Sequence, residues 1–304
     1  MRLSVTDLCN LRCAYCMPEG GVGKLRHEDI LRIEEIGEIV CAAAKLGVAK
    51  VRITGGEPLV RRGITEICRS VSSVPGIAET CLTTNGTLLP QLAAELRDAG
   101  VNRLNISLDS LDAGTYRMIT RGGELSEVLH GIEAARAAGF DTIKINCVLI
   151  GGVNDCELLA IAEMSMTAGI HVRFIEMMPV GGSAGGVYGR FLAGGSVLAA
   201  APELKRLGDD GVARLYAFPG APGTVGLIKA VSEPFCAGCN KIRVTSDGML
   251  KPCLHSAEEI RLRGLHGTEL IETMRAAILG KPFKHNLDVL LQSAGARDMN
   301  AIGG

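Results

Sequence analysis

Short segments rich in β-branched residues alternate with longer segments of helical period between residues 2 and 177. This alternation predicts a parallel sheet covered by helices, because parallel neighbours need a crossover connection between them. Six such units fit either a doubly wound sheet or an incomplete (βα)6 TIM-like barrel. The strands are expected at 2–6, 51–54, 80–84, 103–108, 142–150 and 171–177, and the helices at 28–47, 64–73, 88–99, 111–119, 124–138 and 155–168.

Paired polar positions within two of these strands help to choose between the two architectures. Lys50 and Arg52 are two residues apart and share one face, and Lys144 and Asn146 repeat this arrangement. Cations that face the inside of a sheet are costly unless an anion lies there. Side chains that reach solvent from strand ends are the alternative. We expect an α/β fold with an open-centred, incomplete barrel that binds an anion.

The pattern weakens after residue 178, where the stretch 179–226 is rich in Gly, Ala and Pro. We therefore expect a partial barrel over 1–178 and a C-terminal extension over 179–304 that contains a helix near 268–279. The net charge of −1 argues against non-specific nucleic-acid binding. With no signal peptide and no apolar run of about 18 residues, we expect a cytoplasmic protein that spans no membrane.

Three cysteines, Cys9, Cys13 and Cys16, follow the first strand with the spacing C-x3-C-x2-C. This position is the carboxyl edge of the sheet, where α/β proteins bind ligands. Three thiolates can hold three irons of a [4Fe–4S] cluster and leave the fourth iron open. A zinc site with a remote fourth ligand is the alternative, although its usual spacing is a C-x2-C pair.

A second group has the spacing C-x2-C-x13-C and consists of Cys236, Cys239 and Cys253. It predicts either a second cluster with an open iron or a structural zinc site that His255 completes. The chain has 11 cysteines in all, and the others stand in apolar or helical segments. We expect these to be small core residues: Cys41, Cys68, Cys81, Cys147 and Cys156.

The first group, with its aromatic residue Tyr15, resembles the radical S-adenosylmethionine (SAM) superfamily. A second mark of that superfamily is "TGGEP" at residues 54–58, directly after the second strand. The resemblance implies that SAM binds the open iron through its amino and carboxylate groups. It also implies that one electron from the cluster cleaves SAM to methionine and a 5′-deoxyadenosyl radical.

Further motifs narrow the resemblance to the GTP 3′,8-cyclase family of molybdenum-cofactor biosynthesis. These are "MRLSVTD", "RITGGEPLVRR", "LTTNG", "NISLDS", "RFIEMMP", the second cysteine group and the terminal "IGG". The resemblance implies two [4Fe–4S] clusters, SAM, and conversion of GTP to (8S)-3′,8-cyclo-7,8-dihydroguanosine 5′-triphosphate. It further implies a reductant protein, a downstream cyclic pyranopterin monophosphate synthase, and a homodimer.

Site residues follow from the motif positions. The resemblance assigns the first cluster to Cys9, Cys13 and Cys16 and the GTP-side cluster to Cys236, Cys239 and Cys253. It implies SAM contacts from Tyr15, Gly55, Gly56, Glu57, Ser107 and Met178. It implies GTP contacts from Arg2, Arg52, Thr83, Lys144, Lys241, Ile242 and Arg243. Lys50 and Arg173 are further candidates for the lining of this anion-binding site. It implies a catalytic role for Gly303 and Gly304, which enter the site as a tail.

Three departures from the family pattern stand out. Lys241 replaces the usual Arg, which keeps the charge but loses the bidentate fork that fits phosphate. Leu8 replaces another Arg, and the chain begins one residue before Arg2, which we expect to be mobile. Two other hypotheses remain open at this point. One is a peptide-modifying radical SAM enzyme with an auxiliary cluster, and the other is a zinc-stabilised binding module.

Overall fold

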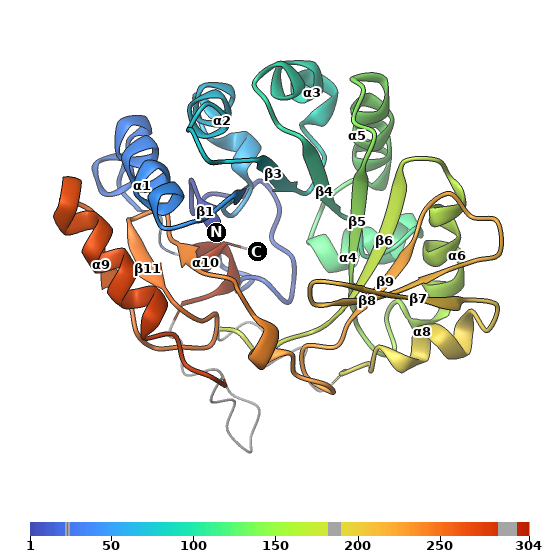
Figure 1. Ribbon diagram of the computed structural model, residues 1–304. Coiled ribbons are helices and arrows are strands. Elements are labelled where there is room, and N and C mark those ends of the chain that lie inside the picture. The colour runs from blue at the N-terminus through green and yellow to red at the C-terminus, as the bar shows by residue number, and fades with distance from the viewer. Residues whose placement is uncertain (22, 24, 182–189, 285–296, 304) are drawn as a thin grey trace.

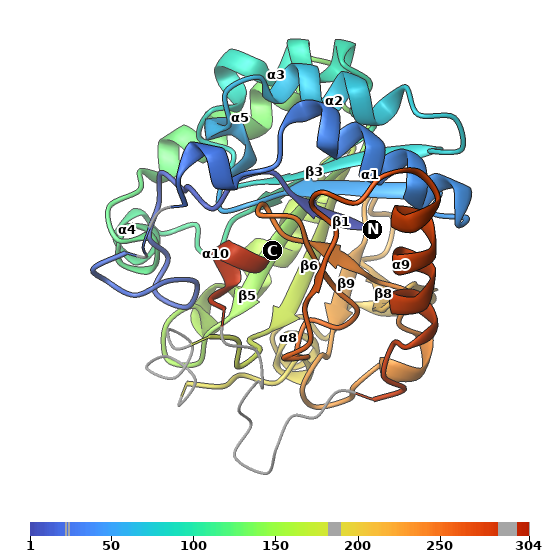
Figure 2. The ribbon, with the colours of Figure 1, turned by 90° about the vertical axis from the view of Figure 1, so that its left-hand side faces the viewer.

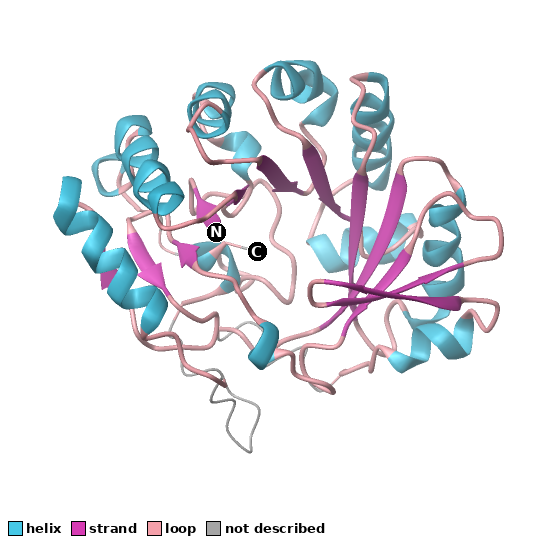
Figure 3. Ribbon diagram, in the orientation of Figure 1, coloured by secondary structure: helices cyan, strands magenta, loops and turns pink. Residues whose placement is uncertain are grey.

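A computed structural model describes residues 1–21, 23, 25–181, 190–284 and 297–303. Within these residues the strands form one curved sheet in the order β12-β11-β10-β1-β2-β3-β4-β5-β6-β9-β8-β7. The strands line the inner side of an arc and most helices cover its outer side (Figure 1 and Figure 3). The expected incomplete barrel is confirmed.

The first six strands run parallel and lie next to one another in chain order. They are β1 (Arg2–Ser4), β2 (Lys50–Thr54), β3 (Glu79–Thr84), β4 (Arg103–Ser107), β5 (Ile143–Leu149) and β6 (Ile170–Glu176). The connecting helices are α1 (Ile33–Lys45), α2 (Ile64–Ser72), α3 (Leu89–Asp98), α4 (Ala113–Thr120), α5 (Leu125–Ala137) and α6 (Leu158–Glu163).

Two helices are shorter than the sequence pattern predicts. Helix α1 begins at Ile33, where the Glu35 carboxylate accepts the backbone N–H of Arg32 and so satisfies a donor at the start of the helix. The segment expected as one helix at 155–168 is α6 flanked by the short 3-10 turns Asp155–Glu157 and Met164–Met166.

Strand β5 shows how the sequence divides the two faces of the sheet. Ile143 and Ile145 are fully buried on the side that the helices cover. Lys144 and Asn146 alternate with them and therefore face the inside of the arc. The inward direction expected for these polar positions is thus observed.

The C-terminal part of the chain extends both edges of the sheet. Strands β9 (Val225–Ile228), β8 (Ala213–Ala217) and β7 (Lys205–Asp210) continue from β6, and α8 (Gly195–Ala200) precedes them. At the other edge, β10 (Arg243–Val244) pairs with β1 and leads to β11 (Met249–Lys251) and β12 (Ile260–Arg261). Helix α9 (Gly267–Leu279) then packs beside α1 (Figure 1). The division at residue 178 stays a prediction.

The end of the described chain lies on the inner side of the sheet. Helix α10 (Met299–Ile302) sits within the arc, close to β1 in both views (Figure 1 and Figure 2). Gly303 follows with φ of 86°, and a Cβ there would lie 2.7 Å from Cγ2 of Thr54. Only glycine fits this position against the side chains of the first two strands.

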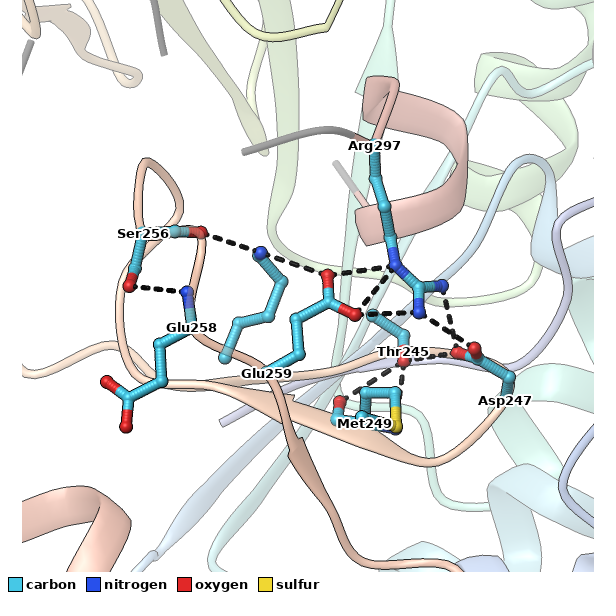
Figure 4. A network of polar contacts seen from close by, with 8 residues as sticks. Thr245, Asp247, Met249, Ser256, Glu258, Glu259 and Arg297 are labelled. Atoms are coloured by element: carbon cyan, nitrogen blue, oxygen red, sulfur yellow. Dashed lines mark hydrogen bonds and ion pairs between the residues drawn. The ribbon is translucent and has the colours of Figure 1, made fainter. Parts of the chain in front are cut away.

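A charged network holds the start of this C-terminal segment (Figure 4). The Arg297 guanidinium donates to both carboxylate oxygens of Asp247, at 3.1 and 2.8 Å. It also donates to Glu259, at 2.7 to 3.0 Å. The fully buried Lys251 donates to the same Glu259 at 3.1 Å and to the Ser256 carbonyl at 2.8 Å. The network therefore ties the tail to the β10–β11 turn and to the segment before β12.

Among the described residues, no helix combines the length and the apolar character that a membrane crossing requires.

Replacing Arg297 with Ala should release the C-terminal segment. The variant leaves two partly buried carboxylates without their main partner, so we expect a loss of about 2 kcal/mol in folding stability. Thermal unfolding measures this loss, and limited proteolysis should cut the tail faster than in the parent protein. Arg275→Ala is the matched control, because Arg275 pairs with Glu272 on an exposed helix face, where an ion pair contributes little to stability. Equal midpoints and equal proteolysis for the two variants would contradict the anchoring role.

Candidate functional site

A cavity of about 300 Å³ opens on the inner side of the sheet at the carboxyl ends of the parallel strands. Both cysteine groups line it, although more than 200 residues separate them in the sequence. The other five cysteines are described and do not line it. Cys68, Cys81 and Cys147 are buried as expected, whereas Cys41 and Cys156 are exposed, so the expectation of a core residue is wrong for these two. The lining cysteines are Cys9, Cys13, Cys16, Cys236, Cys239 and Cys253.

The first cysteine loop is held from two sides. The backbone N–H of Ala14 donates to the Ile119 carbonyl at 2.9 Å, and the N–H of Cys16 donates to the Cys13 carbonyl at 2.9 Å. Burial raises the pKa of the Cys9 thiol to about 11 and that of Cys16 to about 12. Bare thiolates are therefore unfavourable here, and a bound metal group would supply the positive charge that they need.

The second cysteine loop is held by a lysine that the sequence motifs do not mark. Lys281 Nζ donates to the carbonyls of Lys241 and Pro252, at 2.6 and 2.8 Å. It also lies 3.7 Å from the Cys239 sulfur. The ammonium group thus joins the strand that follows Cys239 to the residue before Cys253, which fixes the loop on which the three cysteines lie.

Both thiol groups fit iron–sulfur clusters better than zinc ions. In the part of the chain that the structure describes, no three Cys, His or acidic side chains converge on a point that would hold one metal ion. Three thiolates around a [4Fe–4S] cluster bind three different irons, so they do not need to converge in this way. His255 is buried and lines the same cavity beside the second group.

The "TGGEP" loop packs directly against the first cysteine loop. The N–H groups of Gly56 and Glu57 donate to the carbonyls of Thr6 and Leu8, each at 2.8 Å. A Cβ on Gly56 would lie 2.4 Å from the Leu8 carbonyl oxygen. The glycines are therefore needed for the approach of two backbone segments, in addition to any contact with a ligand.

The Glu57 carboxylate is buried beneath this loop. It accepts hydrogen bonds from the N–H of Leu59 and Asn85, at 3.0 and 2.7 Å, and from the Thr84 hydroxyl at 2.7 Å. Burial raises the pKa of Glu57 to about 7, while these three donors oppose the rise. The side chain lines the cavity and joins the loop to the end of β3.

Tyr15 and Asp109 form a second buried polar contact near the first group. The Tyr15 hydroxyl donates to Asp109 at 2.7 Å, and the Val148 N–H donates to the other carboxylate oxygen at 2.8 Å. Burial raises the pKa of Asp109 to about 6. Ser107 and Met178 line the cavity on the same side of the sheet.

Arginines dominate one level of the inner face. One row of register partners crosses five neighbouring strands. In the order β10, β1, β2, β3 and β4, its residues are Arg243, Arg2, Arg52, Cys81 and Arg103. Burial lowers the pKa of Arg2, and Arg243 and Arg52 lower it further. Burial also lowers the pKa of Arg243 to about 10. Such a row is costly unless an anion compensates it.

The residues predicted to bind a nucleotide fall into two sets. The first set lines the cavity and consists of Arg2, Arg52, Thr83, Lys241 and Arg243. Within the described chain, the buried Thr83 hydroxyl has no hydrogen-bond partner. The second set lies elsewhere. Lys50 pairs with Glu79, Ile242 is in the apolar core, and Lys144 and Arg173 pair with Asp210.

The predicted catalytic tail is described only in part. The carbonyl of Gly303 accepts a hydrogen bond from Arg243, which belongs to the arginine row. Gly304 lies outside the described residues.

Sequence reasoning missed four polar residues near the site. Asp109 lies inside the "NISLDS" motif, which could have drawn attention to it, and Arg103 opens the strand before that motif. Lys281 and Asp210 belong to segments without a motif, so only the fold brings them to the site.

Comparison with known proteins agrees with this geometry. The profile described as "Radical SAM superfamily" matches residues 3–165, and that described as "Molybdenum Cofactor Synthesis C" matches residues 170–287. Curated proteins named GTP 3′,8-cyclase match the whole chain. One from Alkaliphilus metalliredigens is 48% identical over 97% of its length. One from Geobacter sulfurreducens is 47% identical over 96% of its length.

Solved structures share the fold at low sequence identity. SuiB from Streptococcus suis superposes with a TM-score of 0.62 at 14% identity, over 89% of this chain and 63% of that one. Coproporphyrinogen III oxidase (HemN) from Escherichia coli gives 0.51 at 14% identity, over 72% of this chain and 55% of that one. The full-length matches at the sequence level are much closer, and they show that the chain belongs to the GTP 3′,8-cyclase family of the radical SAM superfamily.

Proposed function

We propose that the protein converts GTP to (8S)-3′,8-cyclo-7,8-dihydroguanosine 5′-triphosphate, the first step of molybdenum-cofactor biosynthesis. One observation carries this proposal: both cysteine groups and three arginines of the row, Arg2, Arg52 and Arg243, line a single cavity. The full-length relatives named GTP 3′,8-cyclase support it. A peptide substrate, the alternative, gives the inward arginines no anion to bind.

The two thiol groups would hold two [4Fe–4S] clusters, the first next to SAM and the second next to GTP. Each cluster held by three thiolates keeps one open iron, and together with SAM the pair supplies the one-electron chemistry of ring closure. The chain's own residues bind, orient and enclose the reactants. On the SAM side these would be Tyr15, Gly55, Gly56, Glu57, Ser107 and Met178, with the Tyr15 hydroxyl oriented by Asp109.

The triphosphate would lie along the cationic wall. Arg2, Arg52 and Arg243 offer guanidinium groups that fit phosphate oxygens, and the unpartnered Thr83 hydroxyl adds a donor. Lys241 offers a point charge without the fork. We assign Ile242 a backbone role, because its carbonyl accepts the Arg2 N–H at 2.9 Å. Lys50 would contribute only long-range charge from its pair with Glu79.

The terminal glycines would complete the reaction chamber. Gly303 is buried, and Arg243 binds its carbonyl, so one arginine links the tail to the phosphate wall. We propose that Gly303 and Gly304 exclude water from the reacting ribose. They would also hold the ribose in position for hydrogen abstraction.

Five further assignments belong to this proposal. Reductive chemistry requires an electron donor, which we take to be a reductant protein. The product is a reactive cyclic nucleotide, so a cyclic pyranopterin monophosphate synthase would consume it. We place the enzyme in the cytoplasm, where GTP and reduced thiols are available. We also expect a homodimer, and two functional parts divided at residue 178.

An anaerobic assay tests the reaction directly. Protein reconstituted with iron and sulfide, then incubated with SAM, dithionite and GTP, should form 5′-deoxyadenosine together with a cyclic GTP-derived product. Omission of GTP should abolish the nucleotide product and leave only slow SAM cleavage. Formation of 5′-deoxyadenosine with GTP present but without any GTP-derived product would reject the cyclase assignment.

Replacing Cys253 with Ala should separate the two thiol groups. We expect the iron content to fall from about eight to about four per chain, because only the first group stays intact. Slow SAM cleavage should persist while GTP turnover is lost. Cys41→Ala is the matched control, since Cys41 is exposed on α1 and distant from the cavity. Unchanged GTP turnover in Cys253→Ala would exclude the substrate role of the second group.

A further inference from the structure

An acidic residue from the C-terminal extension binds two of the inward cations. The Asp210 carboxylate accepts from Lys144 Nζ at 2.8 Å and lies 3.5 Å from an Arg173 guanidinium nitrogen. The two cations are largely buried, with side chains 14% and 5% exposed, whereas the Asp210 side chain is 52% exposed. The carboxylate thus reaches the buried cations from the solvent side.

The position of Asp210 follows from the hairpin that carries it. Asp210 is the last residue of β7, and Gly211, with φ of 61°, begins the turn into β8. The tip of this hairpin points toward the inside of the arc (Figure 1). Strand β7 is the outermost strand of the sheet, and most of its residues are exposed. Its pairing with β8 is interrupted by a register shift between Arg206 and Gly208.

One of the two cations that Asp210 binds, Arg173, is also held by contacts that do not involve Asp210. Arg173 NH1 donates to the Val172 carbonyl at 2.9 Å and lies 3.1 Å from the Thr224 hydroxyl. Gly226 leaves room for this side chain, because a Cβ there would lie 2.5 Å from the Arg173 Cδ. The guanidinium is therefore anchored through one nitrogen and offers the other to an anion. Asp210 occupies that second nitrogen.

We propose that Asp210 is a displaceable internal counter-ion: it occupies Lys144 and Arg173 in the empty enzyme, and the substrate triphosphate must remove it to bind there. This inference rests on the proposed function and adds a residue that sets substrate affinity. The hairpin is held mainly by its pairing with β9, so its tip can move without disturbing the parallel strands.

The displacement would make the site selective for long phosphate chains. A ligand that reaches Lys144 and Arg173 has to break both contacts of Asp210. Only a highly charged ligand gains more electrostatic free energy from the two cations than the loss of these contacts costs. A ligand that stays at the arginine row leaves Asp210 in place. While the site is empty, the carboxylate opposes the effect of burial on the pKa of Lys144, and so favours the charged amine.

Binding measurements on Asp210→Asn test the proposal. The probes are GTP and inorganic tripolyphosphate, and their dissociation constants are measured by calorimetry on the anaerobically reconstituted enzyme without SAM. Loss of the competing charge should tighten both ligands about five- to tenfold. Without ligand, the Asn variant should also unfold at a lower temperature than the parent. Added ligand should then raise the unfolding midpoint of the variant more than that of the parent. Unchanged or weaker binding would overturn the proposal.

Asp209→Asn is the matched control. Asp209 is the neighbouring residue and pairs with the exposed Arg206, so the control removes the same charge from the same hairpin. Its affinities should stay within about twofold of the parent. An equal gain in both variants would overturn the proposal, because it would reflect net charge alone. If the parent binds tripolyphosphate but not GTP, the proposed function fails, while the comparison with tripolyphosphate still decides the role of Asp210. If the parent binds neither, both fail.

Discussion

The inward row of arginines is the constraint on which the rest of the site depends. Burial and mutual repulsion lower the pKa of Arg2, which shows how unfavourable the charges are in an empty barrel. Buried cations of this kind are tolerated only if a nearby anion offsets the free energy that their desolvation costs. Carboxylates of the chain balance four of the cations: Asp210 pairs with Lys144 and Arg173, and Glu79 pairs with Lys50 and Arg103. Of the arginines that line the cavity, Arg243 donates to the Gly303 carbonyl, and cysteine sulfurs partly oppose the fall in the pKa of Arg2 and Arg243. Glu79 and Asp210 partly oppose the fall in the pKa of Arg52.

The sheet topology explains how two distant cysteine groups meet. The first group follows β1, and β10 pairs with the same strand, so the second group, which spans β10, is carried to the adjacent edge. The opposite edge receives β9 and the hairpin that carries Asp210. The C-terminal segment then lies against the side chains of β1 and β2 on the inner face and is held at its start by Arg297. The extension therefore lengthens both edges of the partial barrel, and its cysteine group and Arg243 line the same cavity as the first cysteine group.

The sequence predicted those elements that have a repeating pattern. The six parallel strands and their helices were found because alternation on β5 and helical period on α1 reflect burial on a covered sheet. The six lining cysteines were found because their spacing is local. Strand β10 was missed because its two residues are a strand only through their pairing with β1. Asp210 and Lys281 were missed for a related reason, since their partners lie in segments that only the tertiary fold brings together. The "TGGEP" glycines were located correctly, but their contact with the Thr6–Leu8 backbone could not be read from the motif.

The central claim is that the inward cations are compensated by the phosphates of the substrate. The most direct test is the affinity of the reconstituted enzyme, without SAM, for GMP, GDP and GTP at low and high salt. The account predicts that each added phosphate tightens binding by several-fold, and that salt narrows the differences because it screens the charges. Equal affinities for the three nucleotides, independent of salt, would contradict it, because the cationic wall would then have no part in substrate binding.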